Sequence, residues 1–248
     1  MVSIDACIEL MRQEFEKDEM KALIQDFLKR ASFSPKWMLY SDYCLDDKNK
    51  PNDVLTFVLM PFFNEATYQE LKKKINEMQP VDIKHTKNIN DEFMSYIKTQ
   101  AVFCFSFILN DRQQLFGTDE TEQIKTVEKL LANLKETFAR WRDNAGSQQM
   151  RDYYSDCVIK IKKQQREIFL KKKVTNHIDV LLITLLASYY TASILKNLPV
   201  LHIFGWFPDR DKTNETCDGL AVPIFNALQY GYMDARQYLF CAAKPDSS

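Results

Sequence analysis

The stretch from Pro199 to Gly231, PVLHIFGWFPDRDKTNETCDGLAVPIFNALQYG, decides the fold that we predict for this chain. It begins with a short apolar run, Val200 to Phe207, which predicts a strand. Asp209 and Asp211 follow at once, and Asp218 opens an apolar segment that predicts a helix. Carboxylates at the carboxyl end of a strand and at the start of the next helix are what a metal-dependent phosphoryl-transfer site requires. Acidic loops without any function show the same pattern.

Length and composition favour one large domain, or one domain with an insertion, for these 248 residues. Hydrophobic residues make up 46% of the chain, which is enough for a substantial core. Only 5 residues are glycine, which argues against a Gly-rich phosphate loop and against an all-β sandwich. The 33 Lys and Arg residues balance 34 Asp and Glu residues. Any contact with nucleic acid must therefore come from a local basic patch.

The cysteines and the apolar segments indicate a cytoplasmic protein. Six cysteines are scattered without a Cys-x-x-Cys pair, as expected for reduced thiols. The acidic, amphipathic N-terminus MVSIDACIELMRQEFEKDEM does not have the pattern of a signal peptide. The segment Ile178 to Leu195 is almost long and apolar enough to span a membrane, but polar residues interrupt it. We expect it to be a buried helix, and we expect no membrane association.

Three more apolar runs predict further strands of a sheet. Lys36 to Leu45 and Val54 to Phe63 flank a polar turn and predict a central β-hairpin. The run Ala101 to Leu109, AVFCFSFIL, is uncharged and predicts an interior strand. Asp42 lies inside the first strand, where a buried carboxylate must be paired, protonated or bound to a metal. An aspartate that faces solvent near a strand end is an equally good interpretation.

Amphipathic spacing predicts helices in the segments between the strands. Residues 1–34 form an N-terminal helical segment, and Asn64 caps a helix that ends at Met78. Shorter helices are predicted from Asp91 to Thr99 and from Tyr232 to Phe240. Lys212 to Thr216 is expected to be a polar loop.

Residues 118–173 predict an inserted helical hairpin, because two segments with heptad spacing flank a short turn. The two sets of seam residues are Ile124, Val127, Leu131, Leu134, Phe138 and Trp141, and Met150, Tyr154, Cys157, Ile161, Gln164 and Ile168. Ordinary packing helices are favoured, because each seam lasts only about three heptads. An arm that binds a partner, or a second copy of the chain, is the alternative.

The second half of this hairpin is basic. Seven Lys or Arg residues stand against Glu167 in the window from Lys160 to Lys173. A solvated helical face is the commoner explanation of such a window, and a patch that contacts phosphate is the functional one.

The order of these features resembles the ribonuclease H-like superfamily, and in particular a bacterial branch of unknown function related to transposases and integrases. The resemblance could cover residues 36 to 230. It depends on an aspartate after an aromatic residue in the first strand, an acid-x-Lys segment, and a closing strand with an acidic loop and helix. These are Tyr40-Ser41-Asp42, Asp82-Ile83-Lys84, Asp209 with Asp211, and Cys217-Asp218-Gly219.

The resemblance implies a single α/β domain, with a mixed sheet flanked by helices and an inserted helical hairpin. It also implies a metal-dependent nuclease that uses Mg²⁺ or Mn²⁺ on nucleic acid. The catalytic candidates are Asp42, Asp82, Asp209 and Asp218, and Asp211 is a further candidate metal ligand. The candidates for contact with the substrate are Lys84, Lys160, Lys163 and Arg166.

Two alternatives remain open at this point. Tyr43-Cys44-Leu45 follow Asp42 in place of the Asp-Glu-Ser-Gly opening usual in that branch, so an inactive relative is one of them. The other is a non-enzymatic interaction protein of a bacterial defence or toxin–antitoxin assembly, which would use the helical hairpin. Convergence of the carboxylates would favour the nuclease, whereas an exposed seam at Leu131 and Phe138 would favour the interaction protein.

Other chemistries have weaker support. The three histidines lack metal-ligand spacing with any cysteine, which argues against zinc. Cys217 near a helix start could act as a nucleophile, but no base is assignable beside it, and a structural thiol is favoured.

Overall fold

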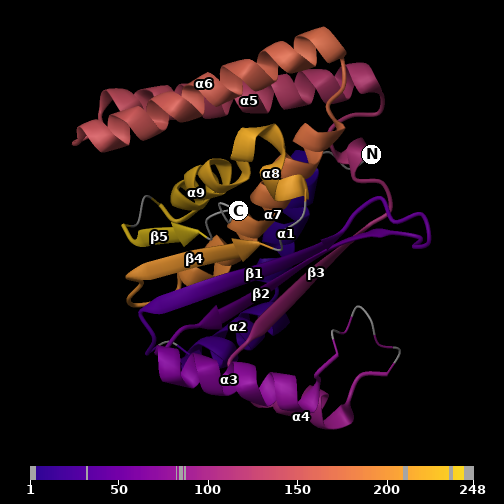
Figure 1. Cartoon of the computed structure of the whole chain (residues 1–248), viewed down its shortest axis with the longest axis vertical. Helices are drawn as coiled ribbons and strands as arrows, with labels where there is room; N and C mark the ends of the chain where they lie inside the picture. The colour runs from indigo at the N-terminus through magenta and orange to yellow at the C-terminus, as the bar shows by residue number, and fades with distance from the viewer. Residues whose placement is uncertain are drawn as a thin grey trace.

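A mixed β-sheet lies in the middle of the structure, between groups of helices (Figure 1). The computed structural model describes residues 4–31, 33–81, 83, 86, 88–208, 212–234 and 237–242. Within these residues five strands form one sheet in the order β3-β2-β1-β4-β5. The strands are β1 (Lys36–Cys44), β2 (Asp53–Pro61), β3 (Phe103–Leu109), β4 (Ile203–Pro208) and β5 (Leu239–Ala242). The α/β class that the sequence predicts is confirmed.

The strand directions divide the sheet into two halves. β1 and β2 form the predicted antiparallel hairpin, and β3 pairs antiparallel with β2. β4 and β5 run parallel to β1, after long crossover connections that contain helices. The prediction that β3 is an interior strand is wrong, because among the described strands β3 pairs with β2 alone and forms one edge of the sheet.

The sheet has one packed face and one face that is only partly covered, the open face. Side chains on successive residues of a strand point to opposite faces. Leu55, Phe57 and Leu59 of β2 are buried, whereas the residues between them are only half-buried. On β3 the residues alternate between half-buried and exposed along the whole strand. The hydrophobic core therefore lies on one side of the sheet.

Helix α7 (Thr175–Leu195) forms the centre of that core. It is long and apolar enough to cross a membrane, but 94% of its most apolar 18-residue window is buried inside the protein. Its buried hydroxyl groups bond back to the helix: Thr184 and Thr191 donate to carbonyls four residues earlier, at 2.8 and 2.7 Å. The interpretation of this segment as a buried helix is confirmed.

The N-terminal helices cover the packed face next to β3. The helices are α1 (Ile4–Glu16) and α2 (Asp18–Ala31), and both present buried aromatic residues. Phe15 stacks on Phe105 of β3 at a centroid distance of 6.0 Å, and Phe27 lies 5.6 Å from Trp37 of β1. At the far end of the sheet lie α3 (Glu65–Met78) and α4 (Asp91–Thr99) (Figure 1). Asn64 caps α3 as predicted, because its side chain accepts from Thr67 N at 2.9 Å.

Two long helices cross the opposite end of the molecule, above α8 and α9 (Figure 1). They are α5 (Glu120–Asp143) and α6 (Gln148–Lys171), where heptad spacing predicts them. A short 3-10 helix, η2 (Gln113–Leu115), links β3 to this pair. Leu131 and Phe138 of the seam are 2% and 1% exposed, so the seam is closed within the chain.

The C-terminal part differs from the prediction in two places. Lys212 to Thr216 lies in a short kinked helix, α8 (Lys212–Gly219), and not in a loop. Helix α9 (Ala221–Tyr232) follows it. The helix predicted from Tyr232 to Phe240 is wrong, because Leu239 begins β5 and pairs with β4. This pairing satisfies the backbone groups of β4 that do not face β1, and local sequence does not reveal it.

Candidate functional site

The first candidate carboxylate lies beside the carboxyl end of β4. Asp42 is paired with Thr56 across the β1–β2 hairpin. On its other side, β1 runs parallel to β4, and the last pair in that ladder is Ser41 with Pro208. Adjacent strands lie about 4.8 Å apart. Asp42 therefore lies one residue beyond the last β1–β4 pair, next to the carboxyl end of β4.

Three other candidate carboxylates, Asp82, Asp209 and Asp211, lie outside the described part of the chain, as does Lys84. Asp209 and Asp211 follow Pro208 in the sequence, and Asp82 and Lys84 belong to the connection between α3 and α4. Within the described residues no group of three or more His, Cys, Asp or Glu side chains is arranged to hold a metal ion.

The face of β1 that carries Asp42 has a polar part and an aromatic part. Thr56 of β2 and Ser106 of β3 share a hydrogen bond at 2.9 Å. Tyr40, two residues before Asp42, stacks on Phe207 of β4 at 5.5 Å. The Tyr40 hydroxyl lies 3.1 Å from that of Tyr68 on α3, and burial together with this contact raises the pKa of Tyr40 well above its usual value. Tyr40 is therefore neutral at physiological pH.

Asp218 has a different environment, because both of its carboxylate oxygens bind α6. Lys163 Nζ lies 2.7 Å from Oδ1, and Gln164 Nε2 donates to Oδ2 at 2.6 Å. The hydrogen bond from Lys163, followed by that from Gln164, lowers the pKa of Asp218. A predicted metal ligand and a predicted substrate contact are thus bound to each other.

The backbone around Asp218 is unusual for residues other than glycine. Cys217 and Asp218 have φ values of 54° and 58°, in the left-handed region. Each such residue costs on the order of 1 kcal/mol or more, so surrounding contacts must hold the turn in place. Gln164 does this from one side, and its own Oε1 lies 3.0 Å from Nε2 of His177 on α7. This chain of contacts fixes α8 between α6 and α7.

Cys217 does not have the properties of a nucleophile. Burial raises the pKa of its thiol to about 12, so the thiolate is scarce at neutral pH. Burial also lowers the pKa of His177. The favoured interpretation of Cys217, a structural thiol, agrees with this environment.

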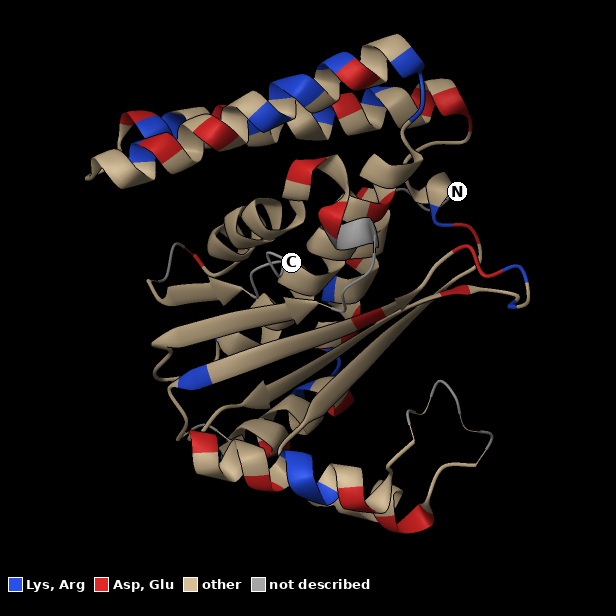
Figure 2. Ribbon diagram, in the orientation of Figure 1, with Lys and Arg blue, Asp and Glu red and all other residues tan. Residues whose placement is uncertain are grey.

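Three of the six basic residues of α6 form ion pairs with acids. Lys160 pairs with Asp156 at 2.8 Å and Lys171 with Glu167 at 2.9 Å, in addition to the pair of Lys163 with Asp218. Arg166 is exposed. Figure 2 shows these alternating charges along the outer helix of the pair.

A charge cluster around buried Arg112, at the turn end of the β1–β2 hairpin, escapes prediction from the sequence. The Arg112 side chain is 4% exposed, and its guanidinium contacts Asp46 and Asp179 at 2.6 Å and Asp53 at 2.7 Å. Burial acts to lower the pKa of Arg112, but the hydrogen bonds to the carboxylates outweigh it and raise the pKa. Burial raises the pKa of Asp179, against the effect of Arg112. The cluster binds the hairpin, η2 and α7 together.

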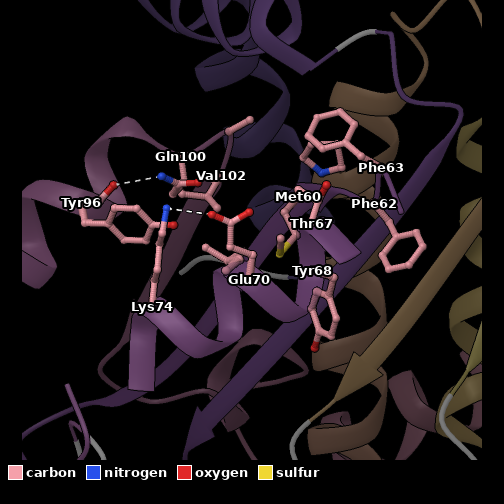
Figure 3. A pocket seen from close by; sticks show the side chains of 13 residues that line it. Met60, Phe62, Phe63, Thr67, Tyr68, Glu70, Lys74, Tyr96, Gln100 and Val102 are labelled. Atoms are coloured by element: carbon pink, nitrogen blue, oxygen red, sulfur yellow. Dashed lines mark hydrogen bonds and ion pairs between the residues drawn. The ribbon is translucent and has the colours of Figure 1, made fainter. Parts of the chain in front are cut away.

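A pocket of about 250 Å³ lies where α3 and α4 meet the ends of β2 and β3 (Figure 3). Met60, Phe63 and Val102 line its apolar part. The polar part holds Lys74, which pairs with Glu70 at 3.0 Å and lies 5.8 Å from the ring centroid of Tyr96. The sequence contains no motif that marks this pocket.

Comparisons with known proteins return no relatives for this chain. No family model, no curated protein and no solved structure matches it.

Proposed function

We propose that the protein is a metal-dependent nuclease with a ribonuclease H-like architecture, and that its centre lies at the carboxyl ends of β1 and β4. The observation that carries the proposal is the parallel pairing of these strands, with Ser41 opposite Pro208. Ligand sites of open α/β sheets lie beyond the carboxyl ends of the strands. Asp42 and Pro208, the last described residue before Asp209, lie side by side at this edge.

The described residues supply only part of a metal site at this edge, which is the carboxylate of Asp42. The proposal therefore requires Asp209 and Asp211 as further ligands. Carboxylate oxygens suit Mg²⁺ and Mn²⁺, and a bound ion of this kind polarises a phosphoryl group and lowers the pKa of water. Asp218 has a positioning role in this proposal, because Lys163 and Gln164 already occupy its oxygens.

The open face of the sheet supports the choice of nucleic acid as the substrate. Tyr40 and Phe207 are half-buried and pair with each other across β1 and β4. Tyr40 lies two residues before Asp42 on the same face of β1. Aromatic side chains on an open sheet are surfaces on which bases stack. Arg166, Lys160 and Lys163 of α6, together with Lys84, remain the proposed contacts with the phosphate backbone. Such a protein would act in the cytoplasm, where its six free cysteines would stay reduced.

The test is cleavage of labelled single-stranded and double-stranded DNA and RNA in the presence of Mn²⁺. We expect wild-type protein to cleave at least one of these substrates, and Asp42→Asn to lower the rate by at least 100-fold. Asp26→Asn on α2 is the control, because it removes an exposed carboxylate that lies outside the site and is expected to leave the rate unchanged. Equal rates for Asp42→Asn and wild type would refute the proposal.

A non-enzymatic interaction protein of a bacterial defence or toxin–antitoxin assembly is the second candidate. The observation that favours it is the outer side of α6, where Ile159, Phe169 and Leu170 are exposed. The buried seam cannot serve as the binding surface. If this candidate is right, wild-type protein shows no metal-dependent cleavage, and Phe169→Glu with Leu170→Glu releases a protein that co-purifies from the native host.

A further inference from the structure

The outer edge of β3 has the features of a strand that pairs with another strand. Across the described residues, β3 forms a ladder with β2 alone, so the backbone groups on its other side have no partner strand. Its sequence, Phe103 to Leu109, is FCFSFIL. Native edge strands are protected from pairing by charged residues, by proline, by bulges or by being very short. This strand of 7 residues has neither a charged residue nor a proline.

The other edge of the sheet differs. β5 has only 4 residues in the described part of the chain, which is short for a pairing surface. At β3, in contrast, Ile108 is 67% exposed and Cys104 and Ser106 are also exposed. Of the two edge strands in the described residues, β3 therefore offers the longer apolar edge.

The sequence of β3 is complementary to itself in an antiparallel arrangement. A two-fold axis at Ser106 pairs Phe105 of one copy with Phe107 of the other, and Cys104 with Ile108. It also places Ser106 opposite its own copy. Aromatic pairs, apolar pairs and hydroxyl pairs directly opposite each other are the combinations that stabilise antiparallel ladders.

The flanking charges agree with the same arrangement. Lys98 precedes the strand at its amino end, in the last turn of α4, and Asp111 follows it at its carboxyl end. Antiparallel pairing brings the amino end of each strand next to the carboxyl end of the other, and an axis at Ser106 places Asp111 opposite Ala101, three residues from Lys98. Parallel pairing would bring like charges together.

We propose that two copies of this chain associate through β3, with a two-fold axis at Ser106, and form one continuous ten-stranded sheet. The open faces of the two sheets then join, and each protomer keeps its own β1–β4 edge. This proposal does not depend on the nuclease assignment, because it uses only the edge strand and its flanking charges.

The first experiment is sedimentation velocity of the full chain from 1 to 100 µM. Wild-type protein should sediment as a dimer at the upper concentrations. Ile108→Lys should shift dissociation to at least tenfold higher concentration, because it places a charge on the paired edge. Ile159→Lys is the matched control, since Ile159 on α6 is 64% exposed, close to the value for Ile108. A wild-type monomer at 100 µM, or equal effects of the two variants, would overturn the proposal.

Disulfide formation gives an independent measurement of the register. Directly opposite residues of an antiparallel ladder have Cα atoms about 4.5 to 5.5 Å apart, within the range for a disulfide. Ser106→Cys with Cys104→Ser should therefore give a covalent dimer under mild oxidation. The native Cys104 should not do so through its own copy, because the two lie four residues out of register. Covalent dimers through Cys104, and none through residue 106, would overturn the register at Ser106.

Discussion

Arg112 joins three parts of the chain through its guanidinium group, which contacts Asp46, Asp53 and Asp179. Asp53 and Asp179 have side chains that are only 15% and 10% exposed. Removal of the arginine leaves these buried carboxylates without a counter-charge. We expect Arg112→Ala to lower the free energy of unfolding by about 3 to 5 kcal/mol.

Urea unfolding at pH 7 measures this loss. Arg112→Lys is the control, since it keeps the charge but loses the planar fork that contacts three carboxylates, and it should cost less than Arg112→Ala. Unchanged stability of Arg112→Ala would show that the cluster contributes nothing to the fold.

The pH dependence of stability should reveal the ion pair of Asp218. Lys163 lowers the pKa of Asp218 in the folded protein below its usual value of 3.8. A carboxylate with a lowered pKa stabilises the folded state at higher pH, and this contribution is lost as the pH falls through its folded pKa. Asp218→Asn should therefore destabilise the protein at pH 7, and this loss should shrink as the pH falls below 3.8.

Urea midpoints of wild type and Asp218→Asn at pH 7 and below pH 3.8 test this expectation. The loss at pH 7 should be modest, because Lys163 is exposed and solvent screens the pair. A larger loss at the lower pH would contradict the assigned ion pair.

The cysteines should differ in their reactivity toward alkylating reagents. Iodoacetamide at pH 8 should label Cys104 and Cys241, which are exposed, before Cys217, whose pKa burial raises to about 12. Peptide mass spectrometry measures the order, and unfolding in urea should remove the difference. Preferential labelling of Cys217 in native protein would restore it as a candidate nucleophile.

At the scale of elements, spacing and caps predict the helices well. Asn64 marks the start of α3, and heptad spacing marks α5 and α6. Pairing partners are harder to predict from a sequence. β3 is apolar because one face packs on α1, and this composition does not distinguish an edge strand from an interior one. The segment around Leu239 becomes a strand because β4 offers an unpaired edge.

The same limit applies to the candidate site. Convergence of Asp42 with Asp209 stays a prediction, because the ladder brings Asp42 beside the end of β4 and Asp209 lies outside the described residues. The cluster at Arg112 escapes prediction because its three carboxylates are 59 to 67 residues away in sequence. Asp179 provides the one signal, since a lone acid in an apolar helix requires a partner.

The closed seam between α5 and α6 gives a prediction at this scale. Leu131 is 2% exposed at the centre of the seam, and Leu131→Ala should cost about 2 to 5 kcal/mol. Met150 has a seam position too, but it is exposed, and Met150→Ala should cost about 0.5 kcal/mol or less. Urea unfolding of both variants compares them, and equal losses would show that the two helices do not pack as described.

At the scale of the whole molecule, metal binding would couple the separate segments of the proposed centre. Ligands that bind only the folded state raise its stability, by about 2.7 kcal/mol at a concentration of 100 times Kd. For a domain of this size that corresponds to a rise in Tm of about 5 to 10 °C. We expect Mn²⁺ to produce such a rise in wild-type protein, and none in Asp42→Asn combined with Asp209→Asn. Differential scanning fluorimetry measures it, and equal rises in both proteins would place the bound ion elsewhere.

The burial of α7 has a consequence for the synthesis of the protein. Its apolar surface is covered partly by α9, which is made after it. Until α9 is made, α7 lacks this cover. Intermediates with exposed apolar surface aggregate readily. A chain truncated after Leu195 should therefore aggregate more readily than the whole chain.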